Sequence, residues 1–151
     1  AGPPGRWRKA RVPPRRPTNR APRGPDDKET RMPNPDSVQV GRLRAIAHAA
    51  AALERDGLRV VDAAYPTADG ALDLIAYRPG RHGRRLVVFC QVAANHAPVL
   101  PARAAWRRMA RQWIDAQPAY QPPLRTRHDA ITAELHRDGG LARLQHIRDA
   151  G

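Results

Sequence analysis

Apolar residues recur at the spacing of a helix in two segments of the chain. In VGRLRAIAHAAAALER, residues 40–55, they lie three and four positions apart, and Asp56-Gly57 follows as a stop signal. The apolar positions there are Leu43, Ile46, Ala47, Ala50 and Leu53. In ARAAWRRMARQWIDAQ, residues 102–117, the same spacing is set by Trp106, Met109, Ala110 and Trp113. Both segments are predicted to be helices that pack one face on a core, and the tryptophans are expected in that core rather than as base-stacking platforms.

Four other segments are rich in β-forming residues and predict strands. They are LRVVDAAY (residues 58–65), ALDLIAYR (71–78), RLVVFCQVA (85–93) and HDAITAEL (128–135). The sequence PGRHGR between the second and third strands suits a hairpin, and the short amphipathic segment LARLQHIRDAG ends the sequence. The order helix, three strands, helix, strand indicates an α/β fold with a mixed central sheet flanked by helices.

Side chains in a strand alternate between the two faces of the sheet. One face of the second strand is therefore predicted to carry Ala71, Asp73, Ile75 and Tyr77. One face of the third is predicted to carry Val87, Phe89, Gln91 and Ala93. If the two strands form a hairpin, Asp73 and Gln91 are expected to meet on one surface.

The first part of the chain differs in composition from the rest. Up to residue 23 it holds eight lysines or arginines, no acid, frequent prolines, and only Trp7 and Val12 as larger apolar residues. So little apolar surface cannot offset the entropy lost on ordering. Residues 1–37 are therefore predicted to be a disordered basic extension, and residues 38–151 a compact domain.

The positive charge of the chain is concentrated in this extension. Of the formal net charge of +13, the segment up to residue 23 supplies +8 and the remainder +5. A concentrated cationic segment indicates a polyanionic partner, most simply nucleic acid. A solvated helix face is the alternative for the arginines of the second helix. The candidate phosphate contacts are Arg6, Arg8, Lys9, Arg11, Arg15, Arg16, Arg20 and Arg23 in the extension, Arg78, Arg81, Arg84 and Arg85 near the hairpin, and Arg103, Arg107 and Arg111 in the second helix.

Other kinds of site have little support in the sequence. The single cysteine, Cys90, excludes an internal disulfide and is expected to be a buried, inert thiol. The histidines show no close metal-ligand spacing, and no glycine-rich phosphate loop or serine nucleophile motif is present. No apolar run is long enough to span a membrane, so we expect a cytoplasmic protein without a membrane partner.

Six short matches occur in the order and spacing of a known family. They are the helix end Leu53-x-x-x-Gly57, GALDLIA (residues 70–76), LVVFCQVA (86–93), Ala110 with Trp113-Ile114, RHDAI (127–131) and HIRDA (146–150). Over roughly residues 41–151 the chain resembles the YraN-like proteins. These are small bacterial proteins predicted to have the restriction-endonuclease-like, or PD-(D/E)xK, fold and to be related to Holliday-junction resolvases.

The resemblance implies a metal site, and the chain departs from it. Such a site holds Mg²⁺ or Mn²⁺ between an aspartate and a glutamate of two adjacent strands, with a lysine that positions water. Asp73 matches the aspartate. Ala71 stands at the position of a neighbouring acid, and Gln91 at that of the metal-binding glutamate. Ala93 stands at the position of the lysine, and the acid of the first helix falls at about Ile46. A further basic position of the family falls near Ala102, with Arg103 beside it. Asp73 is then expected to cap the sheet end or to pair with an arginine, and Gln91 to hydrogen-bond within the former cleft.

The chain is accordingly predicted to be a non-catalytic nucleic-acid-binding protein without a cofactor, a pseudo-nuclease. Structured RNA, including the ribosome, is preferred over DNA as the partner, and the oligomeric state is left open. The alternative is a structure-selective DNA endonuclease that depends on Mg²⁺ or Mn²⁺ and has a rearranged site, with Asp69 as a shifted carboxylate. A further alternative is an accessory subunit whose former cleft binds another protein.

Overall fold

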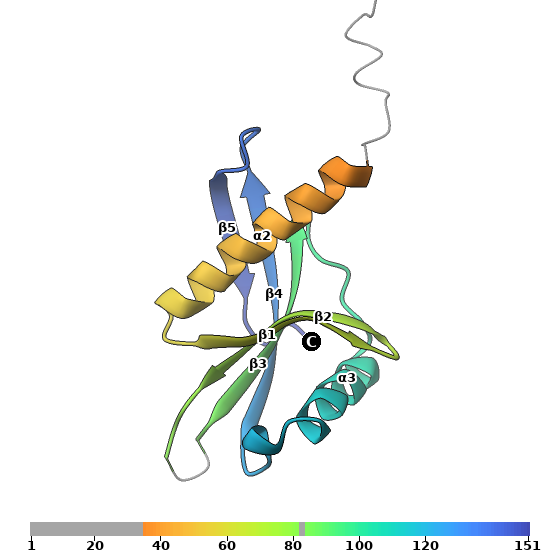
Figure 1. Ribbon diagram of the computed structural model, residues 1–151, viewed down its shortest axis with the longest axis vertical. Helices are drawn as coiled ribbons and strands as arrows, with labels where there is room; N and C mark the ends of the chain where they lie inside the picture. Colours follow the sequence, from red (N-terminus) through yellow and green to blue (C-terminus); the bar gives the residue numbers. More distant parts are fainter. Residues whose placement is uncertain (1–34, 82–83) are drawn as a thin grey trace, which may run out of the picture. The chain divides into compact units, whose positions relative to one another are not determined.

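The computed structural model describes residues 35–81 and 84–151 (Figure 1). The basic residues predicted to bind nucleic acid between Arg6 and Arg23 lie outside the described residues, so their role stays a prediction. The elements in chain order are α2 (Pro35–Arg55), β1 (Arg59–Thr67), β2 (Gly70–Arg78), β3 (Leu86–Ala94), α3 (Arg103–Asp115), the 3₁₀ turn η3 (Pro118–Tyr120), β4 (Arg125–Leu135) and β5 (Leu141–Ile147).

The strands form one five-stranded sheet in the order β1-β2-β3-β4-β5. Pairing is antiparallel from β1 to β3, parallel between β3 and β4, and antiparallel between β4 and β5. A parallel pair needs a crossover connection, and α3 lies in the segment that provides it. The α/β fold with a mixed central sheet flanked by helices is thereby confirmed.

The two helices cover opposite faces of the sheet. Figure 1 shows α2 crossing β3, β4 and β5. Successive residues of β3 alternate between two buried clusters: Val88 and Cys90 pack with α2, whereas Val87 and Phe89 pack with α3. The exposed fractions of Trp106 and Trp113 are at most 1%, so their predicted place in the core is confirmed. Cys90 is fully buried as predicted, and this burial raises the pKa of its thiol.

Helix α2 differs from the prediction in its start and in its buried face. It begins at Pro35, where proline is tolerated because the first turn lacks intrahelical N–H bonds. Leu43, predicted to face the core, is 56% exposed, and Ala47 is exposed as well. Because the helix is rich in alanine, several of its faces are equally apolar, and the spacing alone does not select one. The buried residues are Ala45, Ala49, Ala52 and Leu53.

The last strand was not identified from the sequence. Residues Leu141–Ile147 pair with β4 at one edge of the sheet, and their burial does not alternate regularly along the strand. An edge strand with one partner needs no continuous apolar run, so the usual sequence signal is weak. Within residues 35–81 and 84–151, neither helix is long and apolar enough to cross a membrane.

Candidate functional site

Asp73 lies where the hydrogen-bonded pairing of β2 with β3 ends. The paired residues run from Arg78 and Leu86 to Leu74 and Cys90, and Asp73 is the next residue of β2. Alternation along β2 also breaks at this point. Leu72 packs on the α3 side together with Ile75, three positions away, whereas Asp73 pairs with Arg42 of α2 on the other side. The predicted shared face of Ala71, Asp73, Ile75 and Tyr77 is therefore wrong at Asp73. The irregularity places a carboxylate between two separating strands.

The carboxylate of Asp73 has partners on both oxygen atoms. Its Oδ1 pairs with the guanidinium of Arg42 on α2, and its Oδ2 accepts the backbone N–H of Val92 on β3 at 2.8 Å. The side chain of Asp73 is 3% exposed and that of Arg42 is 47% exposed. The expected pairing of Asp73 with an arginine is therefore confirmed, although the sequence did not indicate which one.

Gln91 crosses between the same two strands in the opposite direction. Its Nε2 donates to the carbonyl oxygen of Ala71 at 2.9 Å. Asp73 thus bonds from β2 to the backbone of β3, and Gln91 bonds from β3 to the backbone of β2. The two side chains therefore tie β2 to β3 at the point where the backbone pairing of these strands ends. None of the hydrogen bonds described for residues 35–81 and 84–151 joins Asp73 to Gln91.

These groups do not fit a divalent metal ion. Mg²⁺ and Mn²⁺ require several oxygen ligands, usually with carboxylates among them. Here a guanidinium occupies one side of the Asp73 carboxylate, and a neutral amide stands in place of the second acid. Ala93 offers no polar atom, and Ile46 packs against the core beneath α2. In the described part of the chain, no group of three acidic, histidine or cysteine side chains is arranged to hold a metal.

Asp69, the candidate for a shifted carboxylate, has its own partner. Arg108 on α3 donates to both of its oxygens, at 2.7 and 3.0 Å. The hydrogen bonds from this guanidinium lower the pKa of Asp69. Asp69 therefore anchors the β1–β2 turn to α3 and adds no second acid to Asp73.

Helix α3 presents a row of arginines that we call the α3 row: Arg103, Arg107 and Arg111. All three side chains are exposed and lie beside the stripe of Trp106, Met109 and Trp113 that packs into the sheet. Among the described residues, no acidic side chain forms an ion pair with any member of the α3 row, in contrast to Arg108. The predicted cationic ridge is therefore present as three uncompensated charges on a rigid helix.

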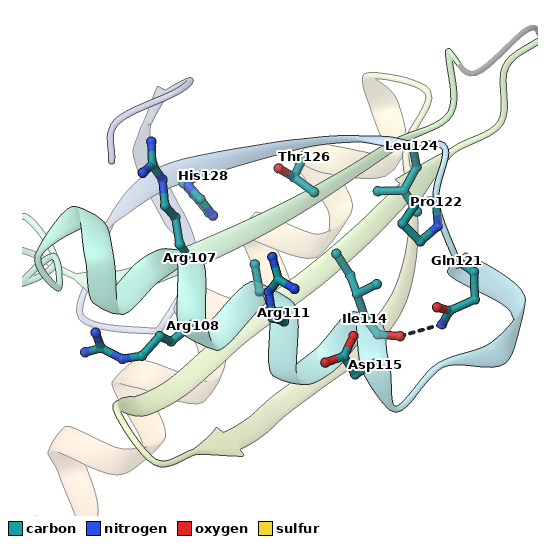
Figure 2. Close-up of a pocket in the computed structure, with 11 residues that line it drawn as sticks. Arg107, Arg108, Arg111, Ile114, Asp115, Gln121, Pro122, Leu124, Thr126 and His128 are labelled. Atoms are coloured by element: carbon teal, nitrogen blue, oxygen red, sulfur yellow. Dashed lines mark hydrogen bonds between the residues drawn. The ribbon is translucent and has the colours of Figure 1, made fainter.

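A cavity of about 520 Å³ lies beside this row, between α3, the start of β4 and the segment that joins them (Figure 2). Arg107, Arg111 and His128 line one part of it, while Ile114, Pro122 and Leu124 form an apolar wall. In Figure 2 the side chain of Arg108 points away from that of Arg111. The arginine spacing is the one sequence signal that pointed toward this cavity, since residues 121–128 approach α3 only in the folded chain.

Comparison with known proteins places the chain in a family. The chain is 33% identical over 108 residues to the UPF0102 protein of Beutenbergia cavernae, and the match covers 66% of this chain and 85% of that relative. The chain belongs to the UPF0102 family. This is the family of the YraN-like proteins, so the resemblance found in the sequence is confirmed at the family level. No model of a known protein family matches the chain.

Two segments that carry the resemblance meet around one buried carboxylate of this UPF0102 chain. Asp129, fully buried, accepts hydrogen bonds from Arg127 at 2.8 and 2.9 Å, from His146 at 2.7 Å and from the N–H of Asp149 at 3.0 Å. Burial alone would raise the pKa of Asp129, but the hydrogen bonds from His146, Arg127 and Asp149 together lower it. The RHDAI and HIRDA matches therefore form one structural network that fixes β5 on β4.

The basic hairpin of this UPF0102 chain contains an arginine with a structural role. Arg85 donates to the carbonyl oxygens of Ala119, Gln121 and Pro123 at 3.2, 2.5 and 3.3 Å. It thereby holds the segment that walls the cavity. The predicted contacts Arg78, Arg81 and Arg84 are exposed. Of the arginines proposed near the hairpin, Arg85 is therefore the one whose guanidinium already binds protein groups.

Proposed function

We propose that this UPF0102 protein is a non-catalytic nucleic-acid-binding protein built on a degenerate nuclease fold. The observation that carries the proposal is the α3 row, three exposed arginines without acidic partners among the described residues. Arginine suits this role because its planar fork binds phosphate oxygens in pairs. The predicted basic extension adds a second, more adaptable source of positive charge.

The dimensions of the α3 row suit a nucleic-acid backbone. Residues four apart on a helix are separated by about 6 Å along its axis, so the row spans about 12 Å. This equals the axial length of roughly three to four nucleotides of one strand. A row held at this spacing can contact phosphates about two nucleotides apart without reading the bases, which favours binding with low sequence preference.

The surroundings of Asp73 support the proposed absence of catalysis. The order of the elements, a helix, an antiparallel three-stranded unit, a crossover helix and a parallel strand, supports the restriction-endonuclease-like fold that the resemblance implies. In that frame Arg42 supplies the positive charge that a metal ion would supply, while Gln91 and Ala93 replace the second acid and the lysine. Such a site holds neither the metal nor the attacking water.

RNA is the preferred partner, including the RNA of the ribosome. An arginine- and proline-rich extension has few internal contacts to lose and can follow an irregular folded RNA. DNA is the alternative polyanion, because the relatives implied by the resemblance act on it. Sequencing the nucleic acid that co-purifies with the full chain, and sedimenting the protein with and without ribosomes, separates the two.

The α3 row is tested by the salt dependence of binding. Fluorescence anisotropy with a labelled single-stranded RNA and a DNA duplex is measured for Arg103→Ala/Arg107→Ala. The control is Arg143→Ala/Arg148→Ala, which removes the same charge from arginines that pair with Glu134 and Asp56. The slope of log K against log salt should flatten by about 1.4 for the RNA and 1.8 for the duplex in the α3 variant only. Equal changes of the salt-dependence slope in the two variants would show that the α3 row is not part of the interface.

The non-catalytic part of the proposal has a separate test. The full chain is incubated with branched and single-stranded DNA in Mg²⁺ or Mn²⁺. We expect no cleavage above a buffer control. Cleavage that disappears in Asp73→Asn would establish the structure-selective endonuclease instead and overturn the proposal.

A further inference from the structure

The cavity beside the α3 row combines two kinds of surface. One part carries the guanidinium groups of Arg107 and Arg111, one helical turn apart, and the other is the apolar wall of Ile114, Pro122 and Leu124 (Figure 2). We propose that this cavity binds a single nucleotide unit, with its phosphate on the two arginines and its base against the apolar wall. The inference deepens the proposed function and rests on it for the identity of the polymer.

The size of the cavity suits a compact organic ligand. Its volume of about 520 Å³ falls within the range of roughly 300–1,000 Å³ that is typical of small-molecule sites. A bare phosphate ion would fill only a small part of this open cavity. The volume therefore points to a ligand that extends beyond its phosphate group.

The charges of the lining residues set the orientation of the ligand in the cavity. Arg107 and Arg111 have no ion-pair partner in the described part of the chain, whereas the neighbouring Arg108 is neutralised by Asp69. Asp115, one turn beyond Arg111, also lines the cavity and repels a phosphate from that end. The phosphate group is therefore assigned to Arg107 and Arg111 on the side of the cavity that His128 lines, away from Asp115.

The apolar wall identifies the rest of the ligand. Ile114 and Leu124 are partly buried members of the α3-side core, so their position is set by the packing of Trp113 and Phe89. Arg85 holds the chain around Pro122 through three carbonyl oxygens. The wall is thus preformed and can receive the face of a planar base at small entropic cost. A phosphate joined to a planar ring whose face can stack on apolar side chains is the chemistry of a nucleotide.

The test uses isothermal titration calorimetry of the full chain with adenosine 5′-monophosphate, adenosine and inorganic phosphate. We expect the monophosphate to bind at least tenfold more tightly than either fragment. Arg107→Ala/Arg111→Ala should weaken this binding at least tenfold, and Arg143→Ala/Arg148→Ala should leave it unchanged. Equal binding of the monophosphate and inorganic phosphate, or equal binding by the two double variants, would overturn the inference. Unchanged circular dichroism and melting temperature establish that each variant is folded.

Three sources of the nucleotide unit are distinguished by competition. A labelled linear RNA and a circular RNA of the same sequence are bound to the protein, and adenosine 5′-monophosphate is added. Displacement of the linear strand alone assigns the cavity to a strand end. Displacement of neither, with the monophosphate bound through Arg107 and Arg111, assigns it to a free nucleotide. Displacement of both strands assigns it to a unit within the strand.

Failure of this inference differs from failure of the proposed function. If both RNAs bind with the expected salt dependence and the monophosphate does not bind, the cavity inference is overturned and the proposed function stands. Arg103 distinguishes the polymer interface from the cavity, because it belongs to the α3 row but does not line the cavity. If the monophosphate binds and neither RNA nor DNA does, the cavity inference stands and the proposed function is overturned.

Discussion

Replacing Arg42 by alanine tests whether this arginine balances the charge of Asp73. In the native chain the buried carboxylate receives the guanidinium on one oxygen and the N–H of Val92 on the other. Arg42→Ala leaves a negative charge beneath α2 with one hydrogen bond. Asp73→Asn removes the charge and keeps an oxygen that can accept the N–H of Val92. The two substitutions and their combination therefore form a double-mutant cycle, in which the sign of each change in the free energy of unfolding can be predicted.

The exposure of the two partners sets the magnitude. Removing one member of a fully buried ion pair typically destabilises a protein by about 3–5 kcal/mol. The side chain of Arg42 is 47% exposed while that of Asp73 is 3% exposed, so water screens the pair from one side. We expect Arg42→Ala to lower the free energy of unfolding by about 2–3 kcal/mol. Asp73→Asn alone should lower it by about 1–2 kcal/mol, the value of a charge-assisted hydrogen bond lost.

The decisive quantity is the effect of Asp73→Asn when Arg42 is already absent. Neutralising an unpaired buried carboxylate should then raise stability by about 1–2 kcal/mol, the opposite sign to its effect in the native chain. Guanidinium chloride unfolding followed by circular dichroism measures all four corners of the cycle. If Asp73→Asn destabilises the native chain and the Arg42→Ala variant equally, Arg42 and Asp73 are not coupled. Arg42 then does not take the place of a metal ion at Asp73.

Three further outcomes are expected. Asp129→Ala should lower the free energy of unfolding by about 3–5 kcal/mol, because it leaves Arg127 without its carboxylate in a largely buried site; a loss below about 1 kcal/mol in chemical unfolding would contradict this. Burial lowers the pKa of His128 below its ordinary 6.5, so the unfolded chain binds the proton more readily than the folded chain. The free energy of unfolding should therefore be highest above pH 6.5 and decrease as the pH falls below it. In urea unfolding between pH 7.5 and 5, His128→Phe should reduce the dependence of this free energy on pH, and an unchanged dependence would refute the assignment. Gln91→Glu combined with Arg42→Ala should give Mn²⁺ binding in calorimetry, and we expect the native chain to give none; equal binding, or no binding by the variant, would contradict the roles assigned to Arg42 and Gln91.

Much of the fold was predictable from the sequence because its strands are long and consistent with their burial. The run from Leu86 to Cys90 is buried throughout, and a segment apolar on both faces indicates a central strand covered by helices. Helix α3 was predictable for a related reason. Trp106 and Trp113 are large enough to dominate its pattern, so the spacing selected a single face.

Other features depend on contacts between distant residues. Arg42 and Asp73 are separated by 31 positions, and neither the arginine-rich helix nor the strand specifies which arginine reaches the carboxylate. The buried face of α2 was ambiguous because alanine occupies several faces. The cavity depends on a loop held by Arg85, which in the sequence is one basic residue among four near the hairpin. Local periodicity contains no information on these pairings.

The crossover between β3 and β4 has a consequence for recognition. Because parallel strands must be joined across the sheet, α3 is fixed at both ends by the strands it connects, and its two tryptophans anchor it between those ends. The helix that carries the α3 row is thereby held on the sheet. A polymer that binds there has to bring its phosphates within reach of that helix, so discrimination among targets would come from how easily each one bends.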